Sequence, residues 1–256
     1  MLTMKDSPER ELPPGLTLAW GLASTARRRG PKPAHSVERI VEAAVEIADR
    51  DGLAALSMPK IAGSLGITAN ALYRYVSSKE ELLVLLAEAG WGPPSSALCH
   101  VTGWREAATE WTHAAVERLR AHPWLLDLPV RGTPLTPNLL GWLEVLLEAM
   151  SGSGLDDQEI LGCALLLDGY ARSTADLART MDVLGAPPAL PPTVIEFLRP
   201  LLNERGFPRL AAMMAGGNYE VNDFTDSDIE FGLNRIIAGI DALIDTKRGK
   251  PEDPKA

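Results

Sequence analysis

Residues 57–76 read SMPKIAGSLGITANALYRYV, and this run constrains the fold more than any other part of the chain. Ser57 and Thr68 each precede a short helical pattern, where a hydroxyl can accept a hydrogen bond from the first free backbone amides. Gly66 lies between the two patterns and supplies the left-handed residue that a sharp turn needs. Four apolar residues are spaced to form a small shared core: Ile61, Leu65, Ile67 and Leu72. The run therefore predicts a helix-turn-helix.

The second of these helices carries polar side chains that suit DNA. They are Thr68, Asn70, Tyr73, Arg74 and Tyr75. A helix of about two turns fits in a major groove, where asparagine pairs with adenine and arginine with guanine or a phosphate. Tyrosine offers a hydroxyl to phosphate and a ring to a thymine methyl. The alternatives are an αα corner of an ordinary helical protein and, for Tyr73, packing into the domain core.

Positive charge flanks this motif. Ser78-Lys79-Glu80-Glu81 forms a capping box, which begins a further helix and places Lys79 where a phosphate would lie. The chain as a whole has a net charge of −9, but residues 27–80 hold nine basic and six acidic residues, so this part carries +3 and the remainder −12. Nucleic acid would therefore meet the chain at one end only. The basic residues ahead of the motif are Arg27, Arg28, Arg29 and Lys32.

These four basic residues form an arm that we expect to follow phosphates or enter a minor groove. The alternative is a solvated arm that contacts nothing. Within the motif, Ser57, Lys60, Thr68 and Ala69 complete the set of candidate DNA-binding residues.

The rest of the chain is also helical in pattern, without a credible period-two strand, which predicts an all-α fold. A short docking helix is expected within 16–22, and a longer one begins at Ser36 and ends at Gly52. Further helices are expected over 82–89, 104–121, 138–150, 156–179, 192–203 and 226–246. Glycine and proline at 90–94 mark a boundary. Four parts are therefore expected: an extension with the basic arm (1–35), a DNA-binding domain (36–90), a larger helical domain (95–247) and a flexible tail (248–256).

Composition narrows the class of protein further. Cys99 and Cys163 make neither a metal-binding spacing nor a disulfide framework. No apolar run reaches the roughly 18 residues of a membrane helix, so we expect a soluble, cytoplasmic protein without membrane contact. His113 and His122 lie nine positions apart, which does not make a chelating pair on a helix. We therefore expect no metal, no cofactor and no catalytic constellation.

Aromatic residues of the larger domain could wall an apolar ligand pocket. A helical stripe contains Trp104, Ala107, Ala108, Trp111, Ala115 and Leu119, and further aromatics are Trp124, Trp142 and Tyr170. The alternative is that such a stripe is merely core. Asp168 is costly in its apolar helix unless it is paired, and Arg172, four residues on, is the obvious partner. The candidate ligand-binding residues are Trp111, Trp142, Asp168, Tyr170 and Arg172. For Asp168 and Arg172, an ion pair within the helix or between subunits is favoured over contact with a ligand.

The final helix predicts a self-association surface. One of its faces is apolar and contains Ile229, Leu233, Ile236, Ile237, Ile240, Leu243 and Ile244. Gly232 and Gly239 would let another helix approach closely. Together with the apolar helix over 156–179, this face would build a four-helix interface in a homodimer.

Much of the N-terminal half resembles the DNA-binding domain of the tetracycline repressor family. The resemblance covers residues 36–90, in particular Ile40–Gly52, Ser57–Ile67 and Ala71–Leu83, and residues 226–240 resemble the final dimerisation helix of the branch nearest that repressor. It implies an Ω-shaped, all-α homodimer in which three N-terminal helices bind a double-stranded operator and a small molecule in the larger domain releases it. It also implies that Ala69, Asn70, Tyr73, Arg74 and Tyr75 face the groove and that Lys79 contacts a phosphate.

Two departures bear on the ligand. Val130 aligns with the histidine through which the tetracycline repressor coordinates a drug-bound metal, just ahead of Gly132-Thr133, and valine cannot bind a metal. The resemblance therefore implies a different, largely apolar organic effector. The extension before Ser36 is the second departure, and we expect it to pack on or beside the DNA-binding domain.

The sequence as a whole favours a one-component transcriptional repressor that acts on a pseudo-palindromic operator. An activator or an effector-free DNA-binding protein shares all of these features. An all-α enzyme or ligand carrier is a further alternative, in which the N-terminal domain serves only for packing.

Overall fold

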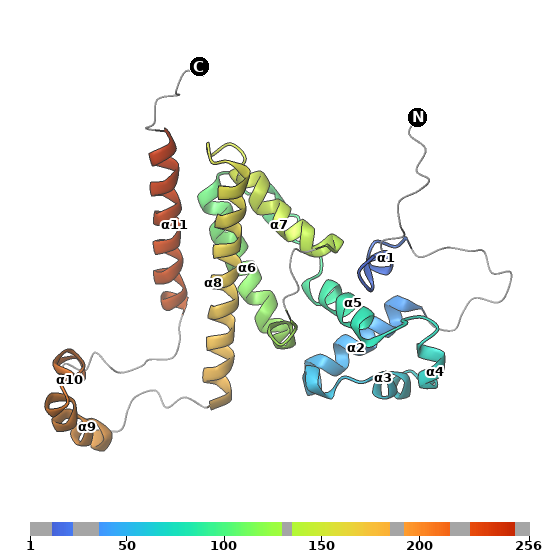
Figure 1. Cartoon of the computed structure of the whole chain (residues 1–256), viewed down its shortest axis with the longest axis horizontal. Helices are drawn as coiled ribbons and strands as arrows, with labels where there is room; N and C mark the ends of the chain where they lie inside the picture. Colours follow the sequence, from blue (N-terminus) through green and yellow to red (C-terminus); the bar gives the residue numbers. More distant parts are fainter. Residues whose placement is uncertain (1–11, 23–35, 130–134, 185–191, 216–225, 249–256) are drawn as a thin grey trace.

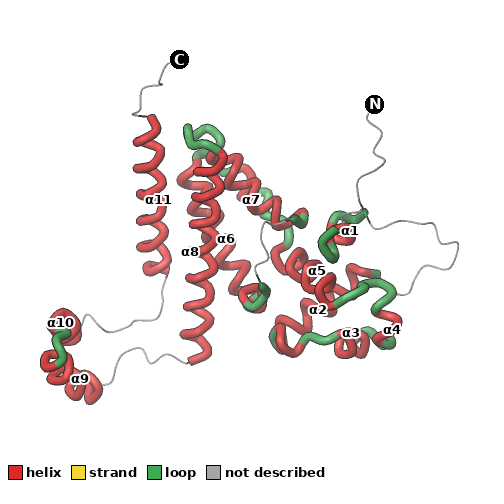
Figure 2. The backbone as a smooth tube through the Cα atoms, in the orientation of Figure 1, coloured by secondary structure: helices red, strands yellow, loops and turns green. Residues whose placement is uncertain are grey.

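The structure is a computed structural model that describes residues 12–22, 36–129, 135–184, 192–215 and 226–248. Within these ranges every regular element is a helix, so the all-α prediction is confirmed (Figures 1 and 2). None of the helices searched in this part of the chain has the length and apolarity needed to span a membrane. The helices are α1 (Leu16–Ala19), α2 (Val37–Asp51), α3 (Met58–Ser64), α4 (Ala69–Leu72), α5 (Lys79–Trp91), α6 (Trp104–Ala121), α7 (Pro137–Met150), α8 (Asp157–Leu184), α9 (Pro192–Glu204), α10 (Pro208–Ala215) and α11 (Asp226–Arg248), with short 3-10 turns η1 (Leu53–Ala55), η2 (Leu98–His100) and η3 (Pro123–Leu126).

Helices α2 to α5 form the N-terminal unit, drawn at the right of Figure 1. Helix α2 begins as expected, because the Ser36 hydroxyl accepts a hydrogen bond from the Arg39 amide at 3.3 Å, and it ends at Gly52. Ile40, Ala44 and Ile47 recur at helical spacing and are buried against α3 and α5. This packed face fixes α3 and α4 at the lower edge of the unit.

Helices α6, α7, α8 and α11 form the larger unit (Figure 1). Helix α8 is 28 residues long and packs against α6, while α7 and α11 cover other faces of this pair. The carboxylate of Asp241 in α11 pairs with Arg105 of α6, and Glu230 of α11 lies 2.8 Å from His113 of α6. The final helix is thus held by polar contacts at both ends of its apolar face.

Helices α9 and α10 pack against each other and lie apart from the other helices in Figure 1. Helix α10 was not expected, because its eight residues give only about two turns of periodic signal. The other long helices agree with the expected ranges to within a few residues, the largest differences being the extension of α8 from 179 to 184 and of the helix over 82–89 to Lys79–Trp91. Helix α1 also forms within the expected docking segment and packs on α5.

Candidate nucleic-acid interface and its links to the larger unit

The helix-turn-helix has the geometry that its sequence predicts. The hydroxyl of Ser57 accepts a hydrogen bond from the Lys60 amide at 3.3 Å, and that of Thr68 accepts one from the Ala71 amide at 3.2 Å. Gly66 has a φ of 68°, in the left-handed region that favours glycine. The shared core also forms, with Ile61 and Leu72 fully buried and Leu65 and Ile67 partly buried around them. The angle between α3 and α4 is therefore fixed by packing and by caps at the start of both helices.

Helix α4 is shorter than the expected two turns, because its regular part spans only Ala69–Leu72. The chain continues as a tightened turn in which the amides of Arg74 and Tyr75 donate to the carbonyls of Ala71 and Leu72, three positions back. This turn carries Tyr73 and Arg74 outward together with Asn70 of the helix. The side chain of Tyr73 is 47% exposed, which excludes the alternative of a core position in the unbound chain.

Two of the expected groove-facing residues are only half-exposed. Ala69 and Tyr75 both pack against the hydrophobic core. Ser57 and Thr68 are exposed, but their hydroxyl oxygens serve as helix caps. Contact of these residues with DNA stays a prediction. We use the term exposed set for Asn70, Tyr73 and Arg74, which are exposed on and after α4, together with Lys79, which is exposed at the start of α5.

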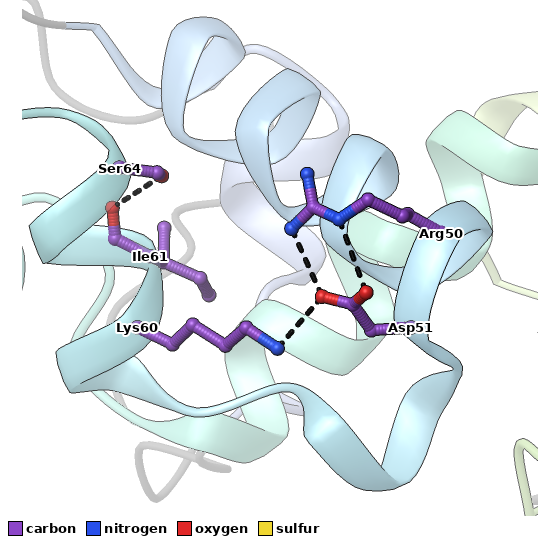
Figure 3. A network of polar contacts seen from close by, with 5 residues as sticks. All are labelled: Arg50, Asp51, Lys60, Ile61 and Ser64. Carbon is purple, nitrogen blue, oxygen red and sulfur yellow. Dashed lines mark hydrogen bonds and ion pairs between the residues drawn. The ribbon is translucent and has the colours of Figure 1, made fainter.

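Lys60 takes part in an ion-pair network that holds α3 against the end of α2 (Figure 3). Its ammonium lies 2.8 Å from the carboxylate of Asp51, which also accepts two hydrogen bonds from the Arg50 guanidinium at 3.0 and 2.9 Å. These hydrogen bonds, first from Arg50 and then from Lys60, hold the pKa of the Asp51 carboxyl well below its usual range. Lys60 remains 39% exposed, so a phosphate contact and the ion pair compete for the same ammonium.

The capping box at the start of α5 forms with one difference, because the Glu81 carboxylate bonds to Ser77, one residue before the N-cap residue Ser78. The Ser78 hydroxyl accepts from the Glu81 amide at 3.1 Å, and the Glu81 carboxylate reaches back to the amide and hydroxyl of Ser77. Lys79, the first residue of the helix, is exposed next to this cap. The basic arm of Arg27, Arg28, Arg29 and Lys32, and Val130 with the following Gly132-Thr133, lie outside the described residues.

The carboxylate of Asp49 links the two units. Its Oδ1 atom lies 2.8 Å from the Nδ1 atom of His122 and accepts a hydrogen bond from the Trp124 indole at 2.6 Å. Asp49 is near the end of α2, whereas His122 and Trp124 follow α6. The ring of Trp124 is buried, and its edge lies against Gly90 of α5, where an added Cβ would come within 2.5 Å of it. This contact joins the N-terminal unit to the end of α6.

Helix α7 makes a second link to α5. The Glu88 carboxylate accepts from the Asn138 amide at 2.8 Å, and the Asn138 side chain donates to the Glu88 carbonyl at 2.9 Å. Further along, the Trp142 indole donates to the Gly92 carbonyl at 3.0 Å. Since α5 is a continuous helix from the capping box to Trp91, a displacement of α7 can be transmitted along it to the helix-turn-helix.

Three tryptophans meet where α5 ends. The rings of Trp91 and Trp142 lie 5.3 Å apart and those of Trp111 and Trp142 lie 5.8 Å apart, in edge-to-face pairs. The Trp111 indole donates to the Trp142 carbonyl at 2.7 Å. Arg172 of α8 lies over the Trp91 ring, with its guanidinium carbon 5.5 Å from the ring centroid. We call Trp91, Trp111, Trp142 and Arg172 the tryptophan cluster.

Four of the five candidate ligand-binding residues are thereby placed at or beside this cluster. Asp168 forms the expected ion pair with Arg172, at 2.8 Å within α8, so this prediction is confirmed. Tyr170 instead lies toward α11, where its hydroxyl donates to the Ile229 carbonyl at 2.7 Å and its ring fills the space beside Gly232. Trp111 and Trp142 are buried in the core with both indole N–H groups bonded. Contact of these residues with a ligand stays a prediction.

Sequence reasoning did not assign Asp49, Trp91 or His122 to a functional site. Asp49 is 73 positions from His122 and 75 from Trp124, so no local spacing relates them. His113 of α6 and His122, which follows α6, have different partners, because His113 faces Glu230 and His122 faces Asp49. Within the described ranges no three His, Cys, Asp or Glu side chains gather as metal ligands.

Helices α8 and α11 leave an apolar face uncovered. Leu161, Leu165 and Leu166 of α8 and Phe231 of α11 are exposed, and Leu165 reaches 65%. Between the two helices lies an open groove of about 570 Å³, whose lining includes Cys163, Leu166, Ile236, Gly239 and Leu243. An added Cβ at Gly239 would meet no described atom within 4 Å, so another helix could approach closely there.

Known proteins share both units. Residues 40–86 match the family model of bacterial regulatory proteins of the tetR family, and residues 100–244 match that of the tetracyclin repressor-like C-terminal domain. The HTH-type transcriptional repressor DrrR1 of Streptomyces coeruleorubidus is 34% identical over 246 residues, which cover 92% of this chain and 87% of that protein. An HTH-type transcriptional regulator of Saccharopolyspora erythraea is 29% identical over 82% of this chain and 86% of its own length.

Solved structures agree with these matches. The TetR family protein ActR of Streptomyces coelicolor in complex with actinorhodin is 25% identical, with a TM-score of 0.65 over 83% of this chain and 99% of that one. Apo ActR, at 24% identity, has a TM-score of 0.64 over 84% of this chain and 99% of its own, and it supports the fold.

Proposed function

Because the chain belongs to the TetR family of bacterial regulatory proteins, and is a DNA-binding transcriptional regulator, we propose that it is a repressor which a small organic effector releases from a palindromic operator. The observation that carries this proposal is the exposed set on and after α4, which a fully packed helix-turn-helix holds in place. The same rigid unit is joined to the larger one through Asp49 and through Glu88. DNA reading and ligand response are thereby connected in one chain.

Each exposed residue has a distinct role on DNA. Asn70 pairs with an adenine edge, and Arg74 with guanine or a phosphate. Tyr73 offers its ring to a thymine methyl or its hydroxyl to a phosphate. Lys79 binds a phosphate beside the groove, where the start of α5 adds the positive end of a helix. Asn70, Tyr73 and Arg74 therefore supply specificity, and Lys79 supplies affinity that falls with salt.

The functional form in this proposal is a homodimer. The exposed apolar side chains of α8 and α11 need a partner, since patches of this kind on soluble proteins mark interaction sites. Two copies of this face, related by a two-fold axis, make a four-helix interface and present two α4 helices to successive major grooves. Half-sites about 34 to 36 Å apart would then be read together.

The effector in this proposal is a planar, largely apolar aromatic molecule that binds near the tryptophan cluster. The three indoles are buried and packed edge to face where α5, α6 and α7 meet, with the Arg172 guanidinium of α8 over Trp91. In this proposal the effector separates these side chains and stacks on the ring faces that their separation exposes. The structure of ActR in complex with actinorhodin supports a small-molecule ligand for a protein of this fold. To release DNA, the effector must bind the two arrangements of α5 and α7 with different affinities.

A reporter driven by the DNA that flanks the chain's own gene tests the direction of regulation. A repressor lowers reporter output when the chain is present, and an activator raises it. Actinorhodin, added to the purified complex with that DNA, is the first effector probe, and a fall in fluorescence anisotropy reports release. The proposal would be contradicted if reporter output did not change and the purified chain did not bind the duplex. That result would favour the alternative of an enzyme or ligand carrier.

A further inference from the structure

The described part of the N-terminal extension packs closely on α5. Gly15 is buried at the start of α1 with a φ of 79°. A Cβ added there would lie 3.0 Å from the Glu81 carbonyl oxygen and 3.1 Å from the Cβ of Val84. Glycine is therefore favoured twice, by the backbone conformation and by the close approach. Leu18 and Ala19 add apolar contact with the core, so this segment is docked along the helix that leaves the helix-turn-helix.

The same segment also reaches the larger unit. The Trp20 indole donates a hydrogen bond at 2.9 Å to the carbonyl of Leu135, which lies 115 positions later in the chain. Leu135 precedes Thr136 and the start of α7. Residues 15–20 thus contact α5 with one end and the entry to α7 with the other (Figure 1).

We propose that residues 12–22 act as a strap that fixes the orientation of the DNA-reading unit relative to the larger unit, with Gly15 and Trp20 as its positioning residues. The consequence for operator binding rests on the function proposed above, because the orientation of each unit sets the spacing of the two α4 helices in a dimer. The strap lies at the junction of α5 and α7, which Glu88 and Asn138 also connect. It therefore stabilises one arrangement of these two helices, and this is the arrangement that the effector must change.

The size of the effect follows from the bond that is lost. One hydrogen bond of this kind shifts an equilibrium between two arrangements by a factor of about five. Trp20 is about half exposed, and its removal leaves both cores intact. A loosened strap should therefore change the populations of interdomain arrangements while global stability changes little.

Two variants and one control test the strap. Trp20→Phe keeps an aromatic ring and removes the indole donor, whereas Gly15→Val places side-chain atoms against Glu81 and Val84. Leu22→Ala changes an exposed residue of the same segment and is the matched control. Hydrogen–deuterium exchange over 83–91 and 138–142 reports the junction, and fluorescence anisotropy reports affinity for duplex DNA from the region flanking the chain's gene. Circular dichroism and thermal melting report the fold.

We expect Trp20→Phe to raise exchange at the junction and to weaken duplex binding by about fivefold. Gly15→Val disturbs the docking on α5 and should shift both readouts in the same direction, while the melting temperature and the Leu22→Ala variant stay close to wild type. Unchanged exchange in both variants would overturn the strap, as would weaker DNA binding that accompanies general unfolding. If the wild-type chain binds no duplex, the proposed function fails, and exchange at the junction still decides whether the strap exists.

Discussion

Asp49 accepts a hydrogen bond from the indole of Trp124 at 2.6 Å, across 75 positions of sequence and across the boundary between the two units. His122 lies against the same carboxylate oxygen at 2.8 Å. Because Trp124 is buried against α5, the carboxylate is held beside the helix that follows the helix-turn-helix. A movement at the end of α6 would therefore shift α2 directly through Asp49. The contacts between α5 and α7 provide a second connection between the units.

Asp49→Ala should uncouple the units. The buried Trp124 donor loses its partner, which costs about 1 to 2 kcal/mol of unfolding free energy. Urea unfolding measures this loss, and hydrogen exchange at the end of α2 measures the local loosening. Glu46→Ala, an exposed carboxylate on the same helix, is the control and should change neither. If both variants lost the same free energy of unfolding, the contact between Asp49 and Trp124 would not contribute specifically to stability.

Tyr73→Ala and Arg74→Ala should each weaken operator binding by about 1 to 3 kcal/mol, because both side chains are exposed beside α4 and contribute to base or phosphate contacts. Thermal melting should be unchanged, since neither residue belongs to the core. Anisotropy titrations with specific duplex DNA provide the measurement. Arg209→Ala on α10 removes a cation elsewhere and should leave binding intact. Full affinity in both α4 variants would mean that another surface reads the DNA.

Leu165→Glu should convert the homodimer into monomers. The side chain is 65% exposed in the single chain, so a charge there does not disturb the fold, whereas at a paired apolar interface it is desolvated. Sedimentation velocity at micromolar concentration distinguishes the two states. Leu22→Glu provides the matched control, because Leu22 is 72% exposed and lies away from α8. A wild-type monomer, or a dimer that survives Leu165→Glu, would contradict the interface.

Asp51→Asn should make the free energy of unfolding less dependent on pH in the acid range. Hydrogen bonds from Arg50 and Lys60 lower the pKa of this carboxyl in the folded chain, relative to about 3.9 when unfolded. A lowered folded pKa contributes stability above the unfolded value, and this contribution is lost as pH falls through the folded value. Wild type should therefore be the more stable at pH 7, with the difference shrinking below about pH 4. Urea midpoints at several pH values test this, with Asp245→Asn as an exposed control, and a difference that grows in acid would contradict it.

Local chemistry explains why the helix-turn-helix was predictable from sequence. The caps at Ser57, Thr68 and Ser78 satisfy amides only three positions away, and the left-handed Gly66 marks the turn between them. The ion pair of Asp168 with Arg172 was predictable for the same reason, since residues four apart on a helix are neighbours.

Contacts between distant segments were not predictable in this way. The sequence indicates Trp124 and Trp142 only as aromatic residues that could wall a pocket, and it does not show that their indoles reach Asp49 and Gly92. The docking of the N-terminal extension was expected only in general terms, and its bond from Trp20 to Leu135 depends on two segments that no local pattern relates. The ligand-binding residues remain predictions because a core tryptophan and a pocket tryptophan share one sequence pattern.

A fluorescence anisotropy titration determines whether the chain recognises specific DNA. The purified chain is titrated into duplex DNA that flanks its own gene and into a scrambled duplex of equal length, each at two salt concentrations. We expect a preference of about a thousandfold or more for the flanking DNA, retained at the higher salt. Equal binding to both duplexes that disappears with salt would contradict it, because contact would then involve phosphates alone.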